Sequence, residues 1–317
     1  MEKLLVLSTN PDLDITAYQQ LNVQVFTAQS IQPKDYAQIT IMLGWQPDLS
    51  TAVLESPNSA LKWVQTLSAG VDYLPLAKLQ AHHILVTNMS GIHAVPISQT
   101  VILYALYFMR DFPILLDNAR QATWTPRPAL TNALTLEGTT WTIFGTGHIG
   151  SELARLLQAF HVKVNGVNRT GHPVANFEHT FAQADWQQAV ASTDVIVNVM
   201  PLTNETTHFY NQAFFDYLQN LYLFVNVGRG KSVDTSALVE ALHTHHVQHA
   251  ALDVFEQEPL APDNPLWQLS NVILTPHYSP QMKHLGRAQH KLFLGNLQKF
   301  LKQDTSLKNQ VDLTKGY

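Results

Sequence analysis

Short apolar runs alternate with segments of helical periodicity along almost the whole chain. The runs contain few polar positions and are separated by lengths that suit a helix, which is typical of parallel strands covered on both faces. Two successive blocks of this kind predict an α/β fold with two doubly wound parallel-sheet units. The strands are expected within residues 3–8, 23–27, 39–43, 62–67 and 83–88 of the first block, and within 140–145, 162–168, 194–200, 221–228, 249–254 and 271–276 of the second.

Two helices stand out from this alternation. A Gly-containing turn in SGIHAVPISQ leads into a long apolar helix over residues 93–117, near the boundary between the two blocks. Its most apolar part, residues 101–109, is much shorter than the roughly 20 residues of a membrane span, so we expect it to be buried between protein layers. Near the C-terminus, Leu292, Leu297 and Phe300 have the spacing of an amphipathic helix, but periodicity does not say which unit it packs on.

Composition narrows the classes of function. The 317 residues suit two domains, and the formal net charge of -5 argues against a general nucleic-acid binder. The absence of cysteine excludes disulfides, thiolate metal sites and cysteine nucleophiles. The N-terminal stretch lacks the pattern of a signal peptide, so we expect a soluble, cytoplasmic protein without membrane contact. We expect no metal site, and interpret the cluster of His243, His245, His246 and His249 as solvated, because it spans a helix end and a strand start.

A glycine-rich loop indicates a dinucleotide site. The predicted strand TWTIF runs into the pattern G-x-G-x-x-G, a helix follows directly, and a second predicted strand comes after it. In this context the first glycine permits a tight turn, the second admits a pyrophosphate and the third lets helix and strand pack closely. The loop residues expected to contact the cofactor are Gly145, Gly147, His148, Ile149 and Gly150.

The stretch GVNRTG lacks an expected acid. About 20 residues after such a loop, an Asp or Glu usually accepts hydrogen bonds from the ribose and repels a 2′-phosphate. Here stand Asn168, Arg169 and Thr170, which remove the repulsion and offer a guanidinium and a hydroxyl to a phosphate. We therefore predict a preference for NADP(H), with NAD(H) possible. The alternative is that Arg169 is solvated or stacks on adenine while NADH is accepted.

Three predicted strand ends carry a plausible catalytic set. Arg229, Glu258 and His277 follow strands whose carboxyl ends should meet at one edge of a parallel sheet, where ligands collect in such folds. Arg229 can bind a 2-oxo acid and polarise its carbonyl group. His277 can donate a proton to the oxygen as a hydride reaches the carbon, and Glu258 can orient the imidazole and favour its charged form.

With these residues in view, the sequence resembles the D-isomer-specific 2-hydroxyacid dehydrogenases over essentially its whole length. In character it is most similar to the glyoxylate/hydroxypyruvate reductase-like members that use NADPH. The matching motifs are SAGVD at 68–72, GTGHIG at 145–150, MPLTNETTHFY at 200–210, NVGRG at 226–230, ALDVFEQEP at 251–259 and TPHYSP at 275–280.

The resemblance implies a Rossmann nucleotide domain, residues 93–288, inserted into a flavodoxin-like substrate domain formed by residues 1–92 and 289–317. It implies that backbone N–H groups of Ala69 and Gly70 bind the substrate carboxylate, and that Asp253 hydrogen-bonds the nicotinamide amide. It further implies a homodimer formed through the nucleotide domains, with the helix at 93–117 contributing. The other residues that it places beside the cofactor are Pro201, Thr203, Thr206 and Val227.

Two parts of the sequence depart from the family's pattern. Gly228 stands where Ala or Ser is usual, and Ser98-Gln99-Thr100 replaces the usual Ala-Glu-His of the linking helix. Trp45 and Tyr278 are candidates to line the substrate pocket, although Trp45 could equally be a core residue. Two other functions remain alternatives: a nucleotide-sensing binding module without turnover, and an NADH-dependent D-lactate or phosphoglycerate-type dehydrogenase. The length of the chain leaves no room for the regulatory domains that phosphoglycerate enzymes often carry.

Overall fold

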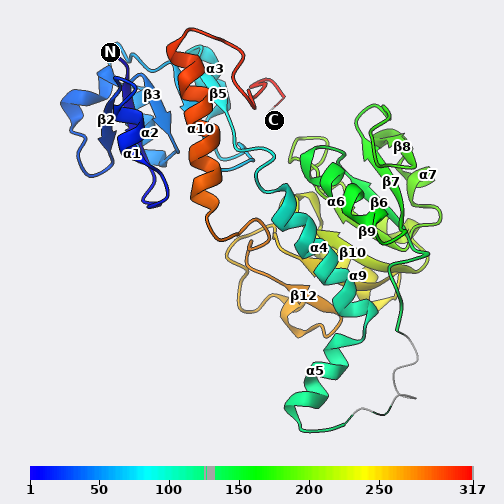
Figure 1. Ribbon diagram of the computed structural model, residues 1–317. Helices are drawn as coiled ribbons and strands as arrows, with labels where there is room; N and C mark the ends of the chain where they lie inside the picture. The colour runs from blue at the N-terminus through cyan, green and yellow to red at the C-terminus, as the bar shows by residue number, and fades with distance from the viewer. Residues whose placement is uncertain (125, 127–132, 316–317) are drawn as a thin grey trace. The chain divides into compact units, whose positions relative to one another are not determined.

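A computed structural model describes residues 1–124, 126 and 133–315 of the chain. It divides into two compact units, one formed by Met1–His93 with Met282–Tyr317 and the other by Ala94–Gln281 (Figure 1). Each unit is built on its own sheet, of five and seven strands, and every strand pairing in both sheets is parallel. The predicted fold class is confirmed.

The first unit has the strand order β2-β1-β3-β4-β5, which is the order of flavodoxin-like sheets. All five strands fall where the apolar runs predicted them: β1 (Lys3–Val6), β2 (Gln24–Thr27), β3 (Ile41–Leu43), β4 (Trp63–Gln65) and β5 (Leu85–Thr87). The helices of this unit are α1 (Ile15–Gln19), the short 3-10 helix η1 (Pro33–Gln38), α2 (Pro47–Leu54), α3 (Leu76–Ala81) and α10 (Leu285–Leu301).

The C-terminal helix α10 belongs to the core of the first unit, which answers the question that periodicity left open. Phe293 and Leu297 are completely buried. The Phe293 ring stacks on Trp63 of β4 with 5.4 Å between centroids and meets the edge of Tyr18 of α1 at 5.1 Å. The last helix of the chain thus covers the sheet that the first 87 residues build.

The second unit has the strand order β12-β11-β10-β9-β6-β7-β8, the doubly wound arrangement in which the order reverses beside β6. Six of its strands were predicted: β6 (Thr140–Phe144), β7 (Lys163–Asn168), β9 (Val195–Asn198), β10 (Leu221–Asn226), β11 (Val247–Leu252) and β12 (Val272–Leu274). The seventh, β8 (His179–Ala182), was missed. It is an edge strand of sequence HTFA, which begins with two polar residues and so lacks the apolar run that marks the others.

Helices cover both faces of this sheet. The α4 helix (Ala94–Met109) packs along α6 (His148–Gln158), and α5 (Phe112–Arg120) continues beyond α4. The remaining helical elements are η3 (Gln183–Asp185), α7 (Trp186–Val190), α8 (Gln212–Tyr217), η4 (Gly230–Ser232), α9 (Thr235–His243) and η5 (Pro265–Gln268).

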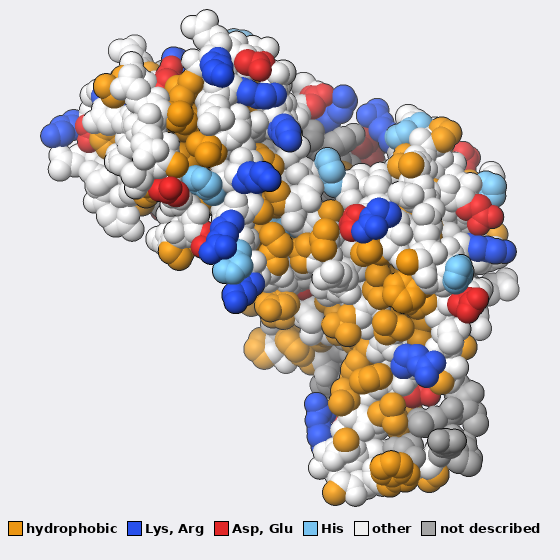
Figure 2. Space-filling model, in the orientation of Figure 1, with side chains coloured by type: hydrophobic (Ala, Val, Ile, Leu, Met, Phe, Trp, Pro, Cys, Tyr) orange, Lys and Arg blue, Asp and Glu red, His pale blue; other side chains and the backbone are white. Residues whose placement is uncertain are grey.

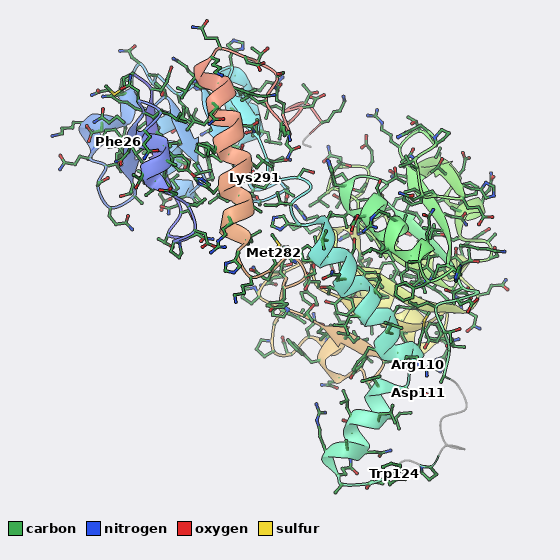
Figure 3. All side chains as sticks on the ribbon, viewed as in Figure 1. Phe26, Arg110, Asp111, Trp124, Met282 and Lys291 are labelled. Atoms are coloured by element: carbon green, nitrogen blue, oxygen red, sulfur yellow. The ribbon has the colours of Figure 1, made fainter. Side chains whose placement is uncertain are left out.

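The single long helix predicted over residues 93–117 is wrong, because two helices stand there. The chain turns at Asp111, which has a left-handed backbone (φ 55°), and α5 begins with Pro113 in its first turn (Figure 3). A residue with positive φ ends one helix, and proline is well tolerated at the start of the next.

The expectation that this apolar stretch is buried between layers is only half correct. Val101, Tyr104 and Ala105 are buried, whereas Leu103 is 61% exposed. Figure 2 shows apolar side chains gathered along α4 and α5. The exposed members of this apolar face, as we call it below, are Leu103, Phe112, Ile114 and Leu116. Within the described residues, no helix combines the length and the apolar character needed to cross a membrane.

The four clustered histidines do not share one environment. The His246 Nδ1 lies 3.2 Å from the carbonyl oxygen of Phe215, and the His249 ring stacks on Phe108 with 4.4 Å between centroids. Among the residues that the structure describes, no three His, Asp or Glu side chains come together as a possible metal site.

Candidate active site

The glycine loop joins β6 to α6, and two of its three glycines stand where a side chain would not be tolerated. Gly145 has φ +104°, and a Cβ at Gly150 would lie 2.0 Å from the carbonyl oxygen of Gly145. Gly147 is the N-cap of α6, and a Cβ there would meet nothing within 4 Å. The first and third glycines are therefore needed for the turn and for the close packing of helix on loop, whereas the second leaves open space at a helix N-terminus, where a phosphate is favoured.

Asn168, at the end of β7, organises the loop that follows. Its Oδ1 accepts hydrogen bonds from the backbone N–H groups of Thr170 (3.2 Å) and Gly171 (2.8 Å). Its Nδ2 donates to the carbonyl oxygen of His172 (2.9 Å) and to Oγ1 of Thr146 (3.2 Å) in the glycine loop. These four bonds use both donors and both acceptor positions of the amide. They also fasten the glycine loop to residues 169–172, so the two predicted phosphate-binding segments lie side by side.

Arg229 is presented by a tightly packed turn between β10 and η4. Its carbonyl oxygen accepts from Asn226 Nδ2 (3.0 Å) and Ser232 Oγ (2.6 Å), and Asn198 Nδ2 binds both Asn226 Oδ1 (2.9 Å) and Ser232 Oγ (2.8 Å). A Cβ at Gly230 would lie 1.8 Å from the carbonyl oxygen of Phe255. The backbone after Arg229 therefore lies directly against the segment that leads to Glu258.

Gly228 has a structural reason to differ from the family's usual Ala or Ser. A Cβ there would lie 3.0 Å from the Met200 carbonyl oxygen and 3.1 Å from Asn198 Nδ2. A side chain at position 228 would therefore require Asn198 or the loop after β9 to shift by a few tenths of an ångström.

Glu258 and His277 form the predicted pair. The Nδ1 atom of His277 lies 2.9 Å from Glu258 Oε2, and Glu258 Oε1 accepts from the backbone N–H of Phe255 at 3.0 Å. An ionised carboxylate only accepts hydrogen bonds, so the proton of the neutral imidazole lies on Nδ1. The Nε2 atom has no hydrogen-bond partner among the described residues, and about half of the His277 side chain (47%) is exposed. The geometry therefore leaves Nε2 to meet a ligand.

Asp253 fixes the segment that carries His277. The completely buried carboxylate accepts from Thr275 Oγ1 (2.6 Å) and from the backbone N–H groups of Tyr278 (2.7 Å) and Ser279 (3.0 Å). The Asp253 carbonyl oxygen accepts from the N–H of His277 itself at 2.8 Å. Residues 277–279 are thus held by one buried aspartate, and His277 keeps its left-handed backbone (φ 52°).

Tyr104 of α4 extends this network. Its hydroxyl lies 2.5 Å from Thr275 Oγ1, and because the Thr275 proton goes to Asp253, Tyr104 is the donor. Burial, together with the nearby Asp253 charge, raises the pKa of Tyr104 to about 12, while its bond to Thr275 opposes the shift. Tyr104 therefore keeps its proton at all physiological pH values and remains a donor.

The loop after β9 is closed on itself. The buried Thr206 donates its hydroxyl to the Pro201 carbonyl oxygen (2.7 Å) and accepts from the backbone N–H of Thr203 (2.7 Å). These contacts fix the shape of the loop, whereas contacts of Pro201, Thr206 and Val227 with a cofactor remain predictions.

The first unit contains the other predicted substrate residues. Asn88 Nδ2 donates to the Ala69 carbonyl oxygen (2.8 Å), and Ser68 Oγ donates to that of Gly70 (2.8 Å). These bonds fix both peptides, while the Ala69 and Gly70 N–H groups make no hydrogen bond within the described part of the chain. Trp45 of the first unit is half-buried against the core of that unit. Tyr278 belongs to the second unit and is 62% exposed. The role of these two aromatic residues at a substrate remains a prediction.

The structure combines two parallel-sheet units with a glycine loop at a helix N-terminus and with an Arg, a Glu and a His that follow strand ends. This combination is typical of a nicotinamide-dependent oxidoreductase. Residues 102–279, more than half of the chain, match the family described as D-isomer specific 2-hydroxyacid dehydrogenase, NAD binding domain. The chain belongs to this family and is a 2-hydroxyacid dehydrogenase of the NAD(P)-dependent class, which confirms the resemblance inferred from the motifs.

Three known proteins illustrate the similarity. The chain is 30% identical over 252 residues to a glyoxylate/hydroxypyruvate reductase B of Citrobacter koseri, covering 79% of this chain and 75% of that one. A crystal structure of phosphoglycerate dehydrogenase from Lactobacillus plantarum shares 40% identity, with coverages of 98% and 100% and a TM-score of 0.58. An NADPH-dependent glyoxylate/hydroxypyruvate reductase from Sinorhizobium meliloti, in complex with NADP and sulfate, shares 25% identity, with complete coverage of both chains and a TM-score of 0.84.

The phosphoglycerate dehydrogenase comparison corrects one argument. We expected a chain of 317 residues to be too short for that class, yet the Lactobacillus plantarum structure is matched over its entire length. Length therefore does not separate a phosphoglycerate-type enzyme from other members of the family.

Sequence reasoning missed the residues that hold the candidate catalytic groups. Asn198 and Asn226 end buried strands, which is a weak signal for a buried polar network, but nothing in their spacing shows that they bind each other. Tyr104 and Thr275 lie far apart in the chain, so only the fold brings them together.

Proposed function

We propose that this protein is an NADPH-preferring reductase that converts a 2-oxo acid into the (R)-2-hydroxy acid, with the reverse oxidation also possible. The observation that carries the proposal is the His277–Glu258 pair, in which Nδ1 is engaged by a carboxylate and Nε2 has no protein partner among the described residues. A fixed tautomer with one outward nitrogen is what general acid–base catalysis by histidine requires.

In the reducing direction Arg229, Glu258 and His277 have different roles. The bound cofactor supplies the hydride. Arg229 binds the carboxylate of the 2-oxo acid and polarises the carbonyl group through its positive charge. Glu258 holds Nδ1–H, so Nε2–H of the imidazolium gives its proton to the oxygen while the carbon receives the hydride. The products are the 2-hydroxy acid, the oxidised cofactor and a neutral imidazole, whose Nε2 accepts the proton again in the oxidation.

The preference for NADPH is supported by residues 168–170. No carboxylate ends β7, and the Asn168 amide is occupied by the loop rather than available to the ribose. The exposed Arg169 and Thr170 then provide the contacts for a 2′-phosphate. The NADP complex of the Sinorhizobium meliloti reductase supports the same proposal by similarity.

For the substrate we propose a small 2-oxo acid of the glyoxylate or hydroxypyruvate type, by similarity to the reductases named above. The Ala69 and Gly70 N–H groups would bind its carboxylate. Asp253 is completely buried in this structure, so its proposed contact with the nicotinamide amide requires the groups that cover it to move. A phosphorylated oxo acid is the second candidate, because the structure with 40% identity is a phosphoglycerate dehydrogenase. Comparing 3-phosphohydroxypyruvate with hydroxypyruvate as substrates separates the two.

We also propose a homodimer in which a second copy covers the apolar face of α4 and α5. Clustered apolar side chains that remain exposed on a single copy are characteristic of protein–protein contacts. Leu103, Phe112 and Ile114 are each between 46% and 61% exposed.

The experiment that tests the function replaces the proposed acid–base group. We expect His277→Gln to lower kcat for oxo-acid reduction by at least about 100-fold, the usual contribution of general acid–base catalysis, while the Kd for NADPH measured by fluorescence stays within about threefold. Turnover close to that of the wild type would contradict the mechanism. Tight NADPH binding by the wild type with no turnover on any oxo acid would instead favour the nucleotide-sensing module.

A further inference from the structure

The loop after β7 contains one more polar side chain than the cofactor proposal uses. The Nδ1 atom of His172 lies 3.1 Å from Oγ1 of Thr170, and both side chains are exposed. Thr170 is one of the two residues already assigned to the 2′-phosphate. We propose that His172 is a third ligand of the cofactor's 2′-phosphate and a determinant of cofactor specificity. The inference rests on the proposed function and deepens it.

The shape of the loop places His172 beside the phosphate loop. Asn168 Nδ2 donates to the His172 carbonyl oxygen and to Thr146 of the glycine loop from one amide nitrogen. The Asn168 side chain therefore joins the His172 peptide to the glycine loop, which is the segment proposed to bind the pyrophosphate. A ribose attached to that pyrophosphate carries its 2′-oxygen toward the end of β7 in this fold.

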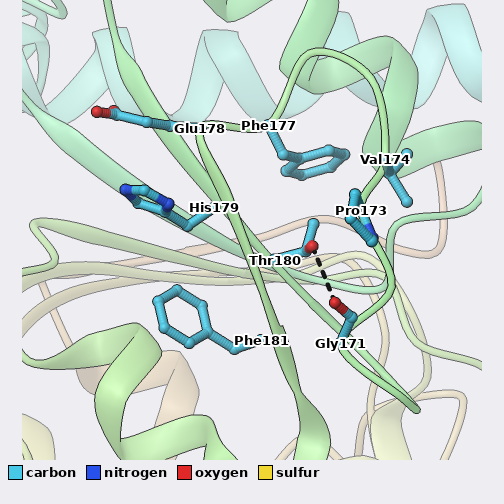
Figure 4. A pocket seen from close by; sticks show the side chains of 8 residues that line it. All are labelled: Gly171, Pro173, Val174, Phe177, Glu178, His179, Thr180 and Phe181. Atoms are coloured by element: carbon cyan, nitrogen blue, oxygen red, sulfur yellow. Dashed lines mark hydrogen bonds between the residues drawn. The ribbon is translucent and has the colours of Figure 1, made fainter.

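The turn is fixed from the other side by glycine and by β8. Gly171 has φ +74°, and a Cβ there would lie 2.9 Å from the backbone nitrogen of Ala182. Thr180 of β8 donates its hydroxyl to the Gly171 carbonyl oxygen at 3.2 Å, as the dashed line in Figure 4 shows. Because both ends of the turn are anchored, residues 169–172 offer their side chains from a fixed backbone, which lowers the entropic cost of binding.

The hydrogen bond to Thr170 also gives His172 the correct tautomer. When the Thr170 hydroxyl donates to Nδ1, the proton of the neutral ring lies on Nε2, which has no hydrogen-bond partner in the described residues. An Nε2–H donates to a phosphate oxygen whether the ring is neutral or charged. With the neutral ring, the donors to the phosphate are therefore the Arg169 guanidinium and His172 Nε2–H. With the charged ring, Nδ1–H donates to the Thr170 hydroxyl, and the hydroxyl proton becomes available as a third donor to the dianion.

The hollow next to this loop is a different feature. It measures about 570 Å³ and lies over β8 and the segment before it, as Figure 4 shows. Its lining contains the carboxylate of Glu178 and neither Lys nor Arg, so its charge does not suit a phosphate. The phosphate ligands are the side chains of the turn itself.

Calorimetry with two fragments of the cofactor tests the proposal on the full-length protein. The probes are adenosine 2′,5′-bisphosphate and 5′-AMP, which differ only in the 2′-phosphate. We expect His172→Ala to weaken binding of the bisphosphate about tenfold, as loss of a charge-assisted hydrogen bond does, and binding of 5′-AMP less than twofold. His172→Gln, which keeps a neutral donor, should give an intermediate loss.

The matched control is His179→Ala, because His179 is an exposed histidine of the neighbouring strand that does not belong to the turn. It should bind both fragments as the wild type does. The proposal is overturned if His172→Ala keeps wild-type affinity for the bisphosphate while Arg169→Ala loses it, and that result leaves the NADPH proposal intact. If the wild type does not prefer the bisphosphate to 5′-AMP, both proposals fail together.

Discussion

At the scale of the residue, the proposed roles of His277 and Glu258 give the two directions of the reaction opposite dependences on pH. With Nδ1 held by the carboxylate, reduction needs the imidazolium and oxidation needs the neutral ring. We therefore predict that kcat/KM for oxo-acid reduction falls with rising pH, whereas kcat/KM for hydroxy-acid oxidation rises. Initial rates in both directions between pH 5.5 and pH 9.5 measure this.

Glu258→Gln provides the matched test at the same scale. A neutral amide no longer stabilises the imidazolium, so the reduction profile should shift to lower pH, and kcat should fall by about 10- to 100-fold. A merely structural role of Glu258 would lower the rate at all pH values without moving the profile.

The residue scale is also where sequence was most informative and where it reached its limit. Arg229, Glu258 and His277 could be proposed as candidates because each follows an apolar run at a strand end, and such ends meet at one edge of a parallel sheet. The structure shows the hydrogen bond between Glu258 and His277, and their catalytic roles stay a prediction. Asn168 was interpreted only as a missing charge, whereas its amide in fact builds the loop. That role depends on a backbone turn, which no spacing rule encodes.

At the scale of the element, a partly buried histidine packs against α4 near its joint with α5. His249 of β11 stacks on Phe108, and its Nδ1 is buried without a hydrogen bond, as is Oδ2 of Asp111 at the joint. Burial lowers the pKa of His249 to about 4, and the Asp111 charge only partly opposes this shift.

The sign of the effect on stability follows from this shift. Below pH 6.5 the unfolded chain binds a proton at His249, whereas the folded chain accepts this proton only near pH 4. The free energy of unfolding therefore decreases as the pH falls from 6.5 to about 4. We predict that His249→Phe removes about 1–2 kcal/mol of this decrease, after allowance for partial solvent exposure. Thermal unfolding of the wild type and of the variant at pH 7 and pH 4.5 measures this. If the melting temperature falls by the same amount between the two pH values in both proteins, the account is contradicted.

The elements also show why some predictions failed. All eleven apolar runs appear as strands, whereas β8, whose sequence HTFA begins with two polar residues and forms no apolar run, was missed. The break between α4 and α5 was missed although Arg110 and Asp111 interrupt the apolar residues there and Pro113 follows in the first turn of α5. Periodicity reports burial well, and it reports backbone turns only where Gly or Pro marks them.

At the scale of the whole molecule, the apolar face of α4 and α5 makes the oligomeric state testable. We predict that the wild type sediments with twice the chain mass of 35.5 kDa, and that Leu103→Lys combined with Ile114→Glu gives a monomer. Charged groups in the centre of an apolar interface are costly to desolvate. Analytical ultracentrifugation measures both masses.

The control for this prediction is Tyr217→Lys, which changes an exposed aromatic residue of α8 outside the apolar face. It should leave the mass unchanged. A wild type that sediments as a monomer, or a double variant that remains dimeric, would show that this face is not the contact between copies.

The central claim, an NADPH-dependent 2-oxo acid reductase, is tested most directly by initial rates of reduced-nicotinamide oxidation. The measurement compares NADPH with NADH, using glyoxylate, hydroxypyruvate, 3-phosphohydroxypyruvate, pyruvate and phenylpyruvate as substrates. We predict a kcat/KM at least about tenfold higher with NADPH, equivalent to roughly 1.4 kcal/mol of discrimination, and the highest rates with glyoxylate or hydroxypyruvate. Equal or faster turnover with NADH would contradict the assignment of residues 168–172 to a phosphate, and no turnover with any pair would contradict the reductase itself.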